Sequence, residues 1–266
     1  MKNNPWMQEI SMKKTTAAAK PLLLFPYEEK PFVKSWSEDG FSPWLIWCLF
    51  GGLLLMIAAL YSGIFPGALS CYIFFVFPFL GLGFFLKWRK DNFSKIFRKV
   101  QWRDVWIIIP GVILNAILIT GLIALEHSWI TPEGSAVQGV TANPVMSGGE
   151  FGSPLFWLLE FPVQMMGEEL IKLLAFGCVF YTGYRVISKD KHRVLWIVLA
   201  TAVSMAVFGM LHYEAYKNVF HCLVIIGFGS LVDYLVLLKT KNLWIVWVIH
   251  LLYDMSLFLA NILGNF

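Results

Sequence analysis

The sequence predicts an all-α fold, a polytopic membrane bundle of about seven transmembrane helices. Of its 266 residues, 58% are hydrophobic and only 14% are charged, whereas a soluble domain averages about 25% charged residues. The apolar residues are gathered in long runs, and about 20 such residues suffice to cross a bilayer as a helix. We therefore expect an integral membrane protein.

Seven runs are long enough to span. They cover residues 43–64, 67–86, 105–125, 154–182, 194–212, 219–238 and 243–263. These runs suggest four regions along the chain. The regions are an amino-terminal arm (1–42), three scaffold helices (43–125), a loop (126–153) and a core of spans that holds the candidate site (154–266).

The lysines and arginines predict the orientation of the spans. They are frequent in the arm and in the segments 87–103 and 183–193, whereas the connection 126–153 contains none. Since cytoplasmic loops carry an excess of Lys and Arg, the amino terminus is expected in the cytoplasm and the carboxy terminus outside. The connection 126–153, rich in Gly and Ser, is then an external loop.

Several ionisable residues lie inside the later spans, where such side chains are costly and usually functional. They are Glu160, Glu168, Glu169, Lys172, His212, His221, Asp233, His250 and Asp254. Glu168 and Lys172 are four residues apart, and so are His250 and Asp254, which places each pair on one helix face.

These residue types together suffice to add water to a peptide bond. A carboxylate shielded from bulk water can take a proton from a water molecule. An imidazole can hold that water or stabilise an oxyanion, and a neighbouring aspartate can fix its tautomer. The same groups also suit a divalent metal such as zinc, with Glu168, His212 and His250 as its expected ligands. Hydrolysis with a metal and hydrolysis without one both remain open.

Each of these features also has a structural interpretation. Glu168 and Lys172 could form an ion pair inside the bundle, and His250 with Asp254 could join two helices. A histidine at the end of a span, such as His212, is often an interfacial hydrogen-bonding residue. We interpret His221 and Asp233 as structural residues apart from the site, and we expect Glu160 to face the external water. One shared site nevertheless explains the remaining set better than several independent explanations do.

Three motifs in a fixed order resemble a known family. They are GEEL at 167–170, FGMLH at 208–212 and LLKTKNLWIVWVIHLLYD at 237–254. Over residues 154–258 the chain is similar to the CPBP family, which contains CAAX prenyl endopeptidases and bacteriocin-processing or immunity (Abi) proteins.

The resemblance implies a role for each matching residue. Glu168 would be the general base that activates water, with Glu169 as a supporting carboxylate. His212 would position the water, and His250 with Asp254 would stabilise the oxyanion.

The first motif departs from the CPBP pattern. The arginine of the family falls at position 173, which is Leu173 here, and Lys172 gives the form Glu-Glu-x-x-Lys instead. That form is similar to the related PrsW proteases, although their second motif ends in glutamate where this chain has His212. Lys172 is therefore expected to take the place of the arginine and to pair with a carboxylate.

The position of His212 raises a geometric question. At about 1.5 Å per residue, Glu168 and His250 fall in the cytoplasmic half of the membrane, whereas His212 falls near the outside. Convergence requires that span five begin deeper, that Gly209 break the helix, or that the helix continue through YEAYKN within the bundle.

The resemblance thus implies an intramembrane endopeptidase that acts on a peptide or protein substrate. We expect it to lie in the bacterial plasma membrane. Nucleic acid is not an expected partner. The main alternative is a non-proteolytic CPBP-like membrane scaffold or bacteriocin-immunity protein. An ion-coupled transporter is a further alternative, because buried ionisable groups also form proton relays.

Overall fold

The computed structural model describes residue 51 and residues 97–130, 161–183 and 192–264. These residues are helical or form short connections, and no strand occurs among them, which confirms the all-α prediction. The predicted arm, the first two spans apart from residue 51, and most of the predicted external loop lie outside the described residues. The count of seven spans and the cytoplasmic amino terminus therefore stay predictions.

The described helices follow the predicted spans closely. They are η1 (Trp102–Asp104), α6 (Val105–Ile130), α7 (Phe161–Thr182), α8 (Arg193–Leu211), α9 (Tyr213–Tyr216), η5 (His221–Gly227), η6 (Phe228–Ser230), α10 (Leu231–Thr240) and α11 (Leu243–Gly264). The third span is longer than predicted, because α6 continues to Ile130, and so residues 126–130 are helical. The sixth span is a π-helix (η5), a 3-10 turn (η6) and α10 in succession.

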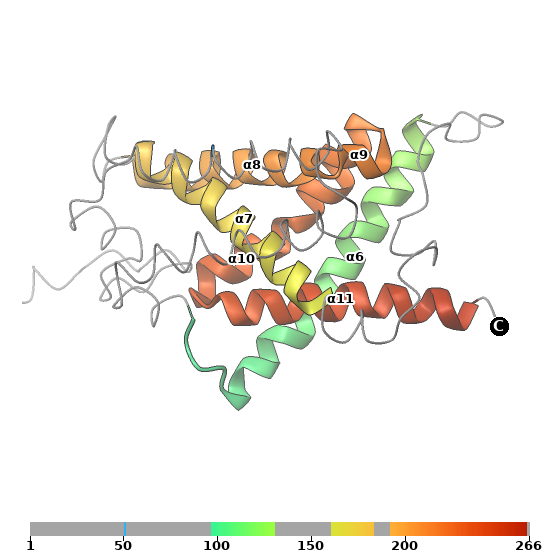
Figure 1. Cartoon of the computed structure of the whole chain (residues 1–266), viewed down its shortest axis with the longest axis horizontal. Coiled ribbons are helices and arrows are strands. Elements are labelled where there is room, and N and C mark those ends of the chain that lie inside the picture. The colour runs from blue at the N-terminus through green and yellow to red at the C-terminus, as the bar shows by residue number, and fades with distance from the viewer. Residues whose placement is uncertain (1–50, 52–96, 131–160, 184–191, 265–266) are drawn as a thin grey trace, which may run out of the picture.

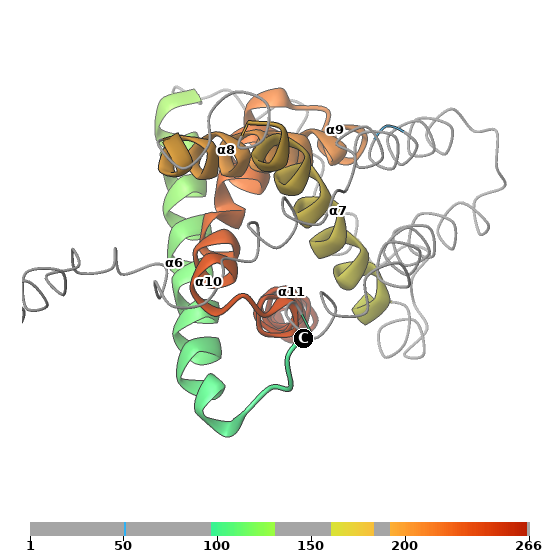
Figure 2. The same cartoon turned by 90° about the vertical axis from the view of Figure 1, so that its left-hand side faces the viewer.

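The helices form a crossed bundle. In Figure 1, α8 runs along one side of the molecule and α11 along the opposite side, with α7 and α10 between them. Figure 2 views α11 almost along its axis and shows α6 running across the full height of the bundle. α7 packs mainly against α8, and α11 packs against α6, α7 and α10. Side chains from α6, α7, α10 and α11 can therefore meet inside the bundle.

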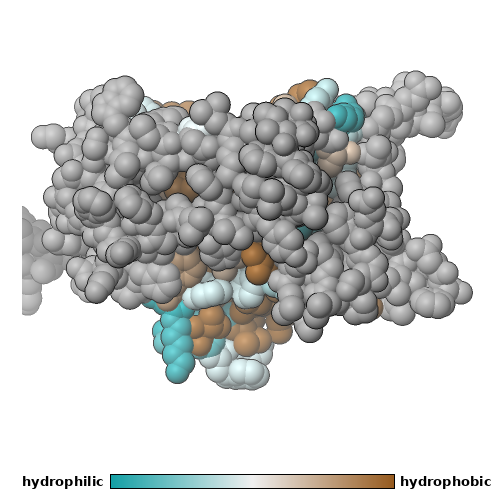
Figure 3. Space-filling view, in the orientation of Figure 1, coloured by the Kyte–Doolittle hydropathy of each residue, from teal (hydrophilic) through white to brown (hydrophobic). Residues whose placement is uncertain are grey.

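Within the described part of the chain, three segments are long and apolar enough to cross a membrane. They are Trp102–Glu126, Val194–Leu211 and His221–Thr240. On the outer face of α6, Trp106 is 76% exposed and Ile117 is 64% exposed. Such a large exposed apolar surface is favourable in contact with lipid and unfavourable in contact with water. Figure 3 shows hydrophobic surface beside hydrophilic residues where α6 begins. The described helices thus belong to an integral membrane protein.

The most buried helix is α7, which carries the paired glutamates. Leu170 and Leu173 are no more than 3% exposed and pack in an apolar cluster with Leu243 at the start of α11. Because apolar neighbours surround this helix, its charged residues must find their partners inside the protein.

Glycine allows α8 to approach the π-helix very closely. A Cβ atom at Gly209 would lie 2.1 Å from the carbonyl oxygen of Cys222, and one at Gly227 would lie 2.7 Å from that of Met205. α8 continues to Leu211, so Gly209 marks a close backbone contact and not a helix break. π-helices often occur beside functional sites, and this contact fixes the end of α8 that carries the second motif.

We predict that Gly209→Ala lowers the thermal unfolding temperature in detergent. The added methyl group must displace backbone atoms of η5, and overpacking of this kind costs about 1–3 kcal/mol. Gly121→Ala is the matched control, because no atom lies within 4 Å of a Cβ at Gly121 and alanine favours helix. Equal unfolding temperatures for the two variants would contradict the close packing of α8 on η5.

Candidate active site

The two glutamates of α7 are both buried, with Glu168 exposed by 7% and Glu169 by 2%. Lys172, one turn later, is exposed by only 3%. Its Nζ atom forms an ion pair with Glu169, three residues before it. The i, i+4 spacing suggested a pair with Glu168, and the structure corrects this to Glu169. Spacings of three and of four residues both bring side chains together on a helix. Contacts with other helices therefore determine which glutamate pairs with Lys172.

The second partner of Lys172 comes from α10. Its Nζ atom lies 2.8 Å from Oδ2 of Asp233. The other carboxylate oxygen of Asp233 accepts a hydrogen bond of 3.0 Å from Nδ2 of Asn115, on α6. Asp233 was interpreted from the sequence as a structural residue apart from the site. It instead lies within the cluster, and α6, predicted to be scaffold, supplies one of its contacts.

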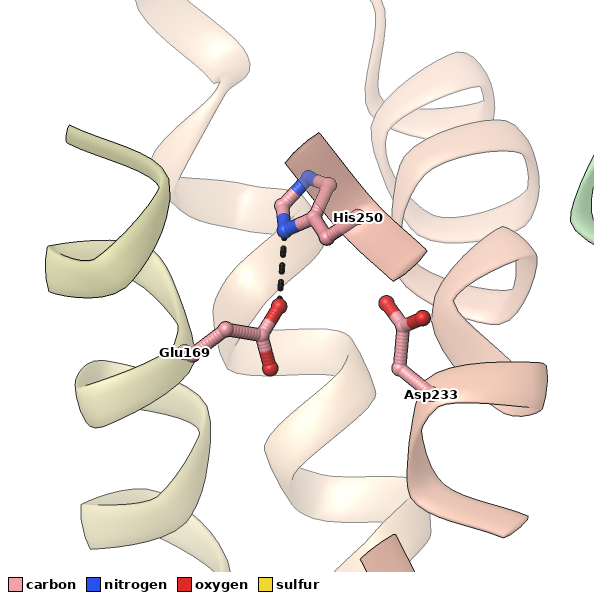
Figure 4. A group of neighbouring side chains, drawn as sticks. All are labelled: Glu169, Asp233 and His250. Carbon is pink, nitrogen blue, oxygen red and sulfur yellow. Dashed lines mark hydrogen bonds and ion pairs between the residues drawn. The ribbon is translucent and has the colours of Figure 1, made fainter. Parts of the chain in front are cut away.

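His250 on α11 connects the carboxylates of two helices. Its Nδ1 atom lies 2.7 Å from Oε1 of Glu169, the contact drawn in Figure 4. Its Nε2 atom lies 3.3 Å from Oδ2 of Asp254 and 3.8 Å from Oε2 of Glu168. The expected pairing of His250 with Asp254 is therefore present. Each ring nitrogen faces a carboxylate, which holds the plane of the imidazole in place.

Glu168 is the least constrained of the buried carboxylates. Its Oε1 atom accepts a long hydrogen bond of 3.4 Å from Nε2 of Gln164, one turn earlier on α7. Among the described residues, the only basic group within 4 Å of its carboxylate is His250. A buried carboxylate with such weak contacts can accept a hydrogen bond from another molecule, including water.

His212 lies beside this cluster and is connected to it by an aromatic ring. Its Nδ1 atom lies 3.0 Å from the carbonyl oxygen of Phe208. Since a carbonyl only accepts, Nδ1 carries the proton, and Nε2 of the neutral ring is an acceptor. The Phe208 ring lies 4.9 Å from the His212 ring, 6.3 Å from the His250 ring and 4.8 Å from Nζ of Lys172. Among the described residues, His212 forms no hydrogen bond with the buried carboxylates.

A second buried pair lies outside the cluster. His221, at the start of η5, lies 3.0 Å from Oε2 of Glu126 through Nδ1. Glu126 was placed in the external loop by the sequence, and it is instead a buried residue near the end of α6. The Tyr216 ring lies 4.7 Å from His221 and 6.5 Å from His212. Burial raises the pKa of Tyr216, so its phenol stays protonated.

In the part of the chain that the structure describes, one group of residues has the donor atoms that a metal ion needs. Atoms of Glu169, Asp233 and His250 lie within 4.8 Å of one another (Figure 4), and one His with two carboxylates suits zinc. The sequence had suggested Glu168, His212 and His250 instead. The ammonium of Lys172, however, contacts both Glu169 and Asp233. A divalent ion on these ligands would lie against another cation in a medium of low dielectric, so these residues do not fit a metal ion.

The structure therefore brings together Glu168, Glu169, Lys172, His250 and Asp254 and leaves His212 at the edge. Sequence reasoning missed Asp233 and Asn115. An aspartate within an apolar run was the available signal for Asp233, whereas an asparagine in a long apolar helix gave little indication.

The comparison with protein families agrees with the motifs. The sequence model of the family described as type II CAAX prenyl endopeptidase Rce1-like matches residues 150–256. No curated protein and no solved structure matches the chain. The matched residues include Glu168, Glu169 and His250. The resemblance predicted from the three motifs is thereby confirmed: residues 150–256 are similar to the Rce1-like type II CAAX prenyl endopeptidases.

Proposed function

We propose that the protein is an intramembrane endopeptidase that hydrolyses a peptide bond of a membrane-associated substrate with water activated by Glu168. The observation that carries this proposal is the convergence of Glu168, Glu169, His250 and Asp254 from α7 and α11. The family match over the same helices supports it. A buried carboxylate beside a positioned imidazole has the elements required for hydrolysis of an amide.

Glu168 acts as the general base in this proposal. Its carboxylate accepts a proton from a water molecule while the water oxygen attacks the scissile carbonyl carbon, and a tetrahedral oxyanion forms. The protonated Glu168 then donates the proton to the leaving nitrogen as the carbon–nitrogen bond breaks. Its weak contacts, a 3.4 Å hydrogen bond from Gln164 and a 3.8 Å approach of His250, leave the carboxylate available for both transfers.

The two histidines have different roles because their hydrogen bonds differ. Glu169 and Asp254 hold His250 from both sides, so that its Nε2–H can be directed at the developing oxyanion. His212 donates from Nδ1 to the carbonyl of Phe208, and its Nε2 can accept a hydrogen bond from the attacking water. The Phe208 ring between the two imidazoles sets their separation.

We propose further that the reaction needs no resident metal ion. Lys172 provides a fixed positive charge beside Glu169 and Asp233, where a metal on these carboxylates would have to lie. The ammonium neutralises these two carboxylates, and the water is activated by a carboxylate base.

The alternative is a non-proteolytic membrane scaffold or bacteriocin-immunity protein, and Leu173 at the position of the family arginine is the observation that favours it. Leu173 is buried in an apolar cluster with Leu170 and Leu243. Lys172 nevertheless supplies a cation beside Glu169, which favours the enzyme. The bacterial plasma membrane and the choice among prenylated, bacteriocin-type or other peptide substrates stay predictions.

Glu168→Gln is expected to abolish peptide cleavage. An amide cannot accept the proton of the attacking water, and loss of a general base costs about 10²–10⁴-fold in kcat. The measurement is cleavage of membrane-anchored peptides by the purified protein in detergent or liposomes. Glu126→Gln is the matched control, because it neutralises a buried carboxylate that pairs with His221 outside the cluster. If Glu168→Gln and the wild type cleave at equal rates, the assignment is wrong and the scaffold alternative is favoured.

Chelators are expected to leave the cleavage rate within about twofold of its untreated value, a change too small to reflect loss of a catalytic metal. The protein would be incubated with a strong zinc chelator and assayed before and after addition of zinc. A rate that falls to the level of Glu168→Gln and returns with zinc would contradict metal-independent catalysis and would require Lys172 to move away from its carboxylates.

A further inference from the structure

We propose that Asp233, held by Asn115, is a positioning residue for the reaction. It shares the Lys172 ammonium with Glu169 and thereby keeps Glu169 available to hold His250. The inference rests on the proposed function, since it assigns a role to a residue of the same cluster that lies outside the three sequence motifs.

The first step of the argument is competition for one oxygen atom. The ammonium of Lys172 and Nδ1 of His250 both contact Oε1 of Glu169. Two donors with full or partial positive charge therefore depend on a single acceptor atom. The donor that binds this oxygen more strongly, either the ammonium or the imidazole, determines where the carboxylate of Glu169 lies.

The second step is that Asp233 shares the ammonium with Glu169. Nζ of Lys172 lies 2.8 Å from Oδ2 of Asp233, and both side chains are at most 5% exposed. The face of the Phe208 ring, 4.8 Å from Nζ, adds a third favourable contact. An ammonium divided between two carboxylates binds each less tightly than it would bind one alone. Without the charge of Asp233, Lys172 would pair with Glu169 only and compete with His250.

The third step concerns Asn115, which fixes Asp233. Its Nδ2 atom donates to Oδ1 of Asp233 over 3.0 Å, so that Oδ2 is left for Lys172. The amide oxygen of Asn115 is buried and has no hydrogen-bond partner among the described residues. An unsatisfied buried acceptor is unfavourable, and an apolar residue would avoid it. The donor side of Asn115 is therefore the part that the protein uses.

A purely structural ion pair between α7 and α10 makes different predictions. Replacing both members of a buried ion pair by apolar residues is often neutral or stabilising. If the pair only joins helices, an apolar pair should preserve both the stability and the cleavage rate. If Asp233 positions Glu169 by sharing the ammonium of Lys172, Asp233→Asn alone should lower the rate. The apolar pair, which lacks the competing ammonium, should recover part of that rate.

The test compares kcat, KM and unfolding temperature for three variants. Asp233→Asn is expected to lower kcat by at least about tenfold with KM unchanged, because the transition state alone depends on the oriented imidazole. Asn115→Leu keeps every charge, and we expect a smaller fall in kcat, about threefold to tenfold, also with KM unchanged. Lys172→Met combined with Asp233→Leu should unfold at or above the wild-type temperature and have a higher kcat than Asp233→Asn, because the ammonium that competes for Glu169 is gone.

Thr201→Val is the matched control. Thr201 lies on α8, and its hydroxyl is buried without a hydrogen-bond partner among the described residues. It lies outside the cluster, so its loss should leave kcat unchanged and unfolding temperature unchanged or higher.

The outcomes separate the inference from the proposed function. If the wild type cleaves and Glu168→Gln does not, the proposed function stands. A wild-type kcat in Asp233→Asn, or an apolar pair that is no faster than Asp233→Asn, then overturns the inference alone. If Asp233→Asn fails to fold, Asn115→Leu decides, and a wild-type kcat in that variant overturns the inference. A wild type that cleaves nothing overturns both.

Discussion

An ammonium ion buried between carboxylates is the interaction on which the arrangement of the site depends. Charges removed from water must be paired within the protein, and Lys172 on α7 meets this requirement through Glu169 on its own helix and Asp233 on α10. Glu169 also contacts His250, which ties α11 to the same chain of contacts. The rotation of these helices about their axes is therefore constrained by one lysine. Glu168, which Lys172 does not contact, keeps a carboxylate with weak partners next to the held imidazole.

The parts of the site that lie on one helix could be predicted from the sequence. The last span was expected at residues 243–263, and α11 extends from Leu243 to Gly264. The pairing of His250 with Asp254 followed from helical spacing, because four residues bring two side chains onto one face. The polytopic helical fold could also be predicted, from composition, since long apolar runs leave few alternatives to a membrane helix.

The contacts between helices could not be predicted, because helix rotation and depth decide them. Asp233 is 61 residues from Lys172, and nothing in the spacing of either residue indicates that they meet. The choice of Glu169 over Glu168 as the partner of Lys172 depends on Asp233 and His250, which approach from other helices. The π-helix was hidden inside an ordinary apolar run, and its close contact with Gly209 places the end of α8. Glu126 was assigned to a loop because the third apolar run was expected to end at residue 125, yet α6 continues past it and His221 pairs with the buried carboxylate.

The coupling between Glu169 and His250 tests most directly whether one ionic cluster joins α7 to α11. A double-mutant cycle with Glu169→Gln, His250→Asn and the combined variant would measure it from the free energies of unfolding in mixed micelles. Residues in direct contact within a network show interaction energies of about 0.5–3 kcal/mol, and we expect a value in this range for a contact of 2.7 Å. Strictly additive effects of the two substitutions would contradict the cluster and, with it, the assembled site.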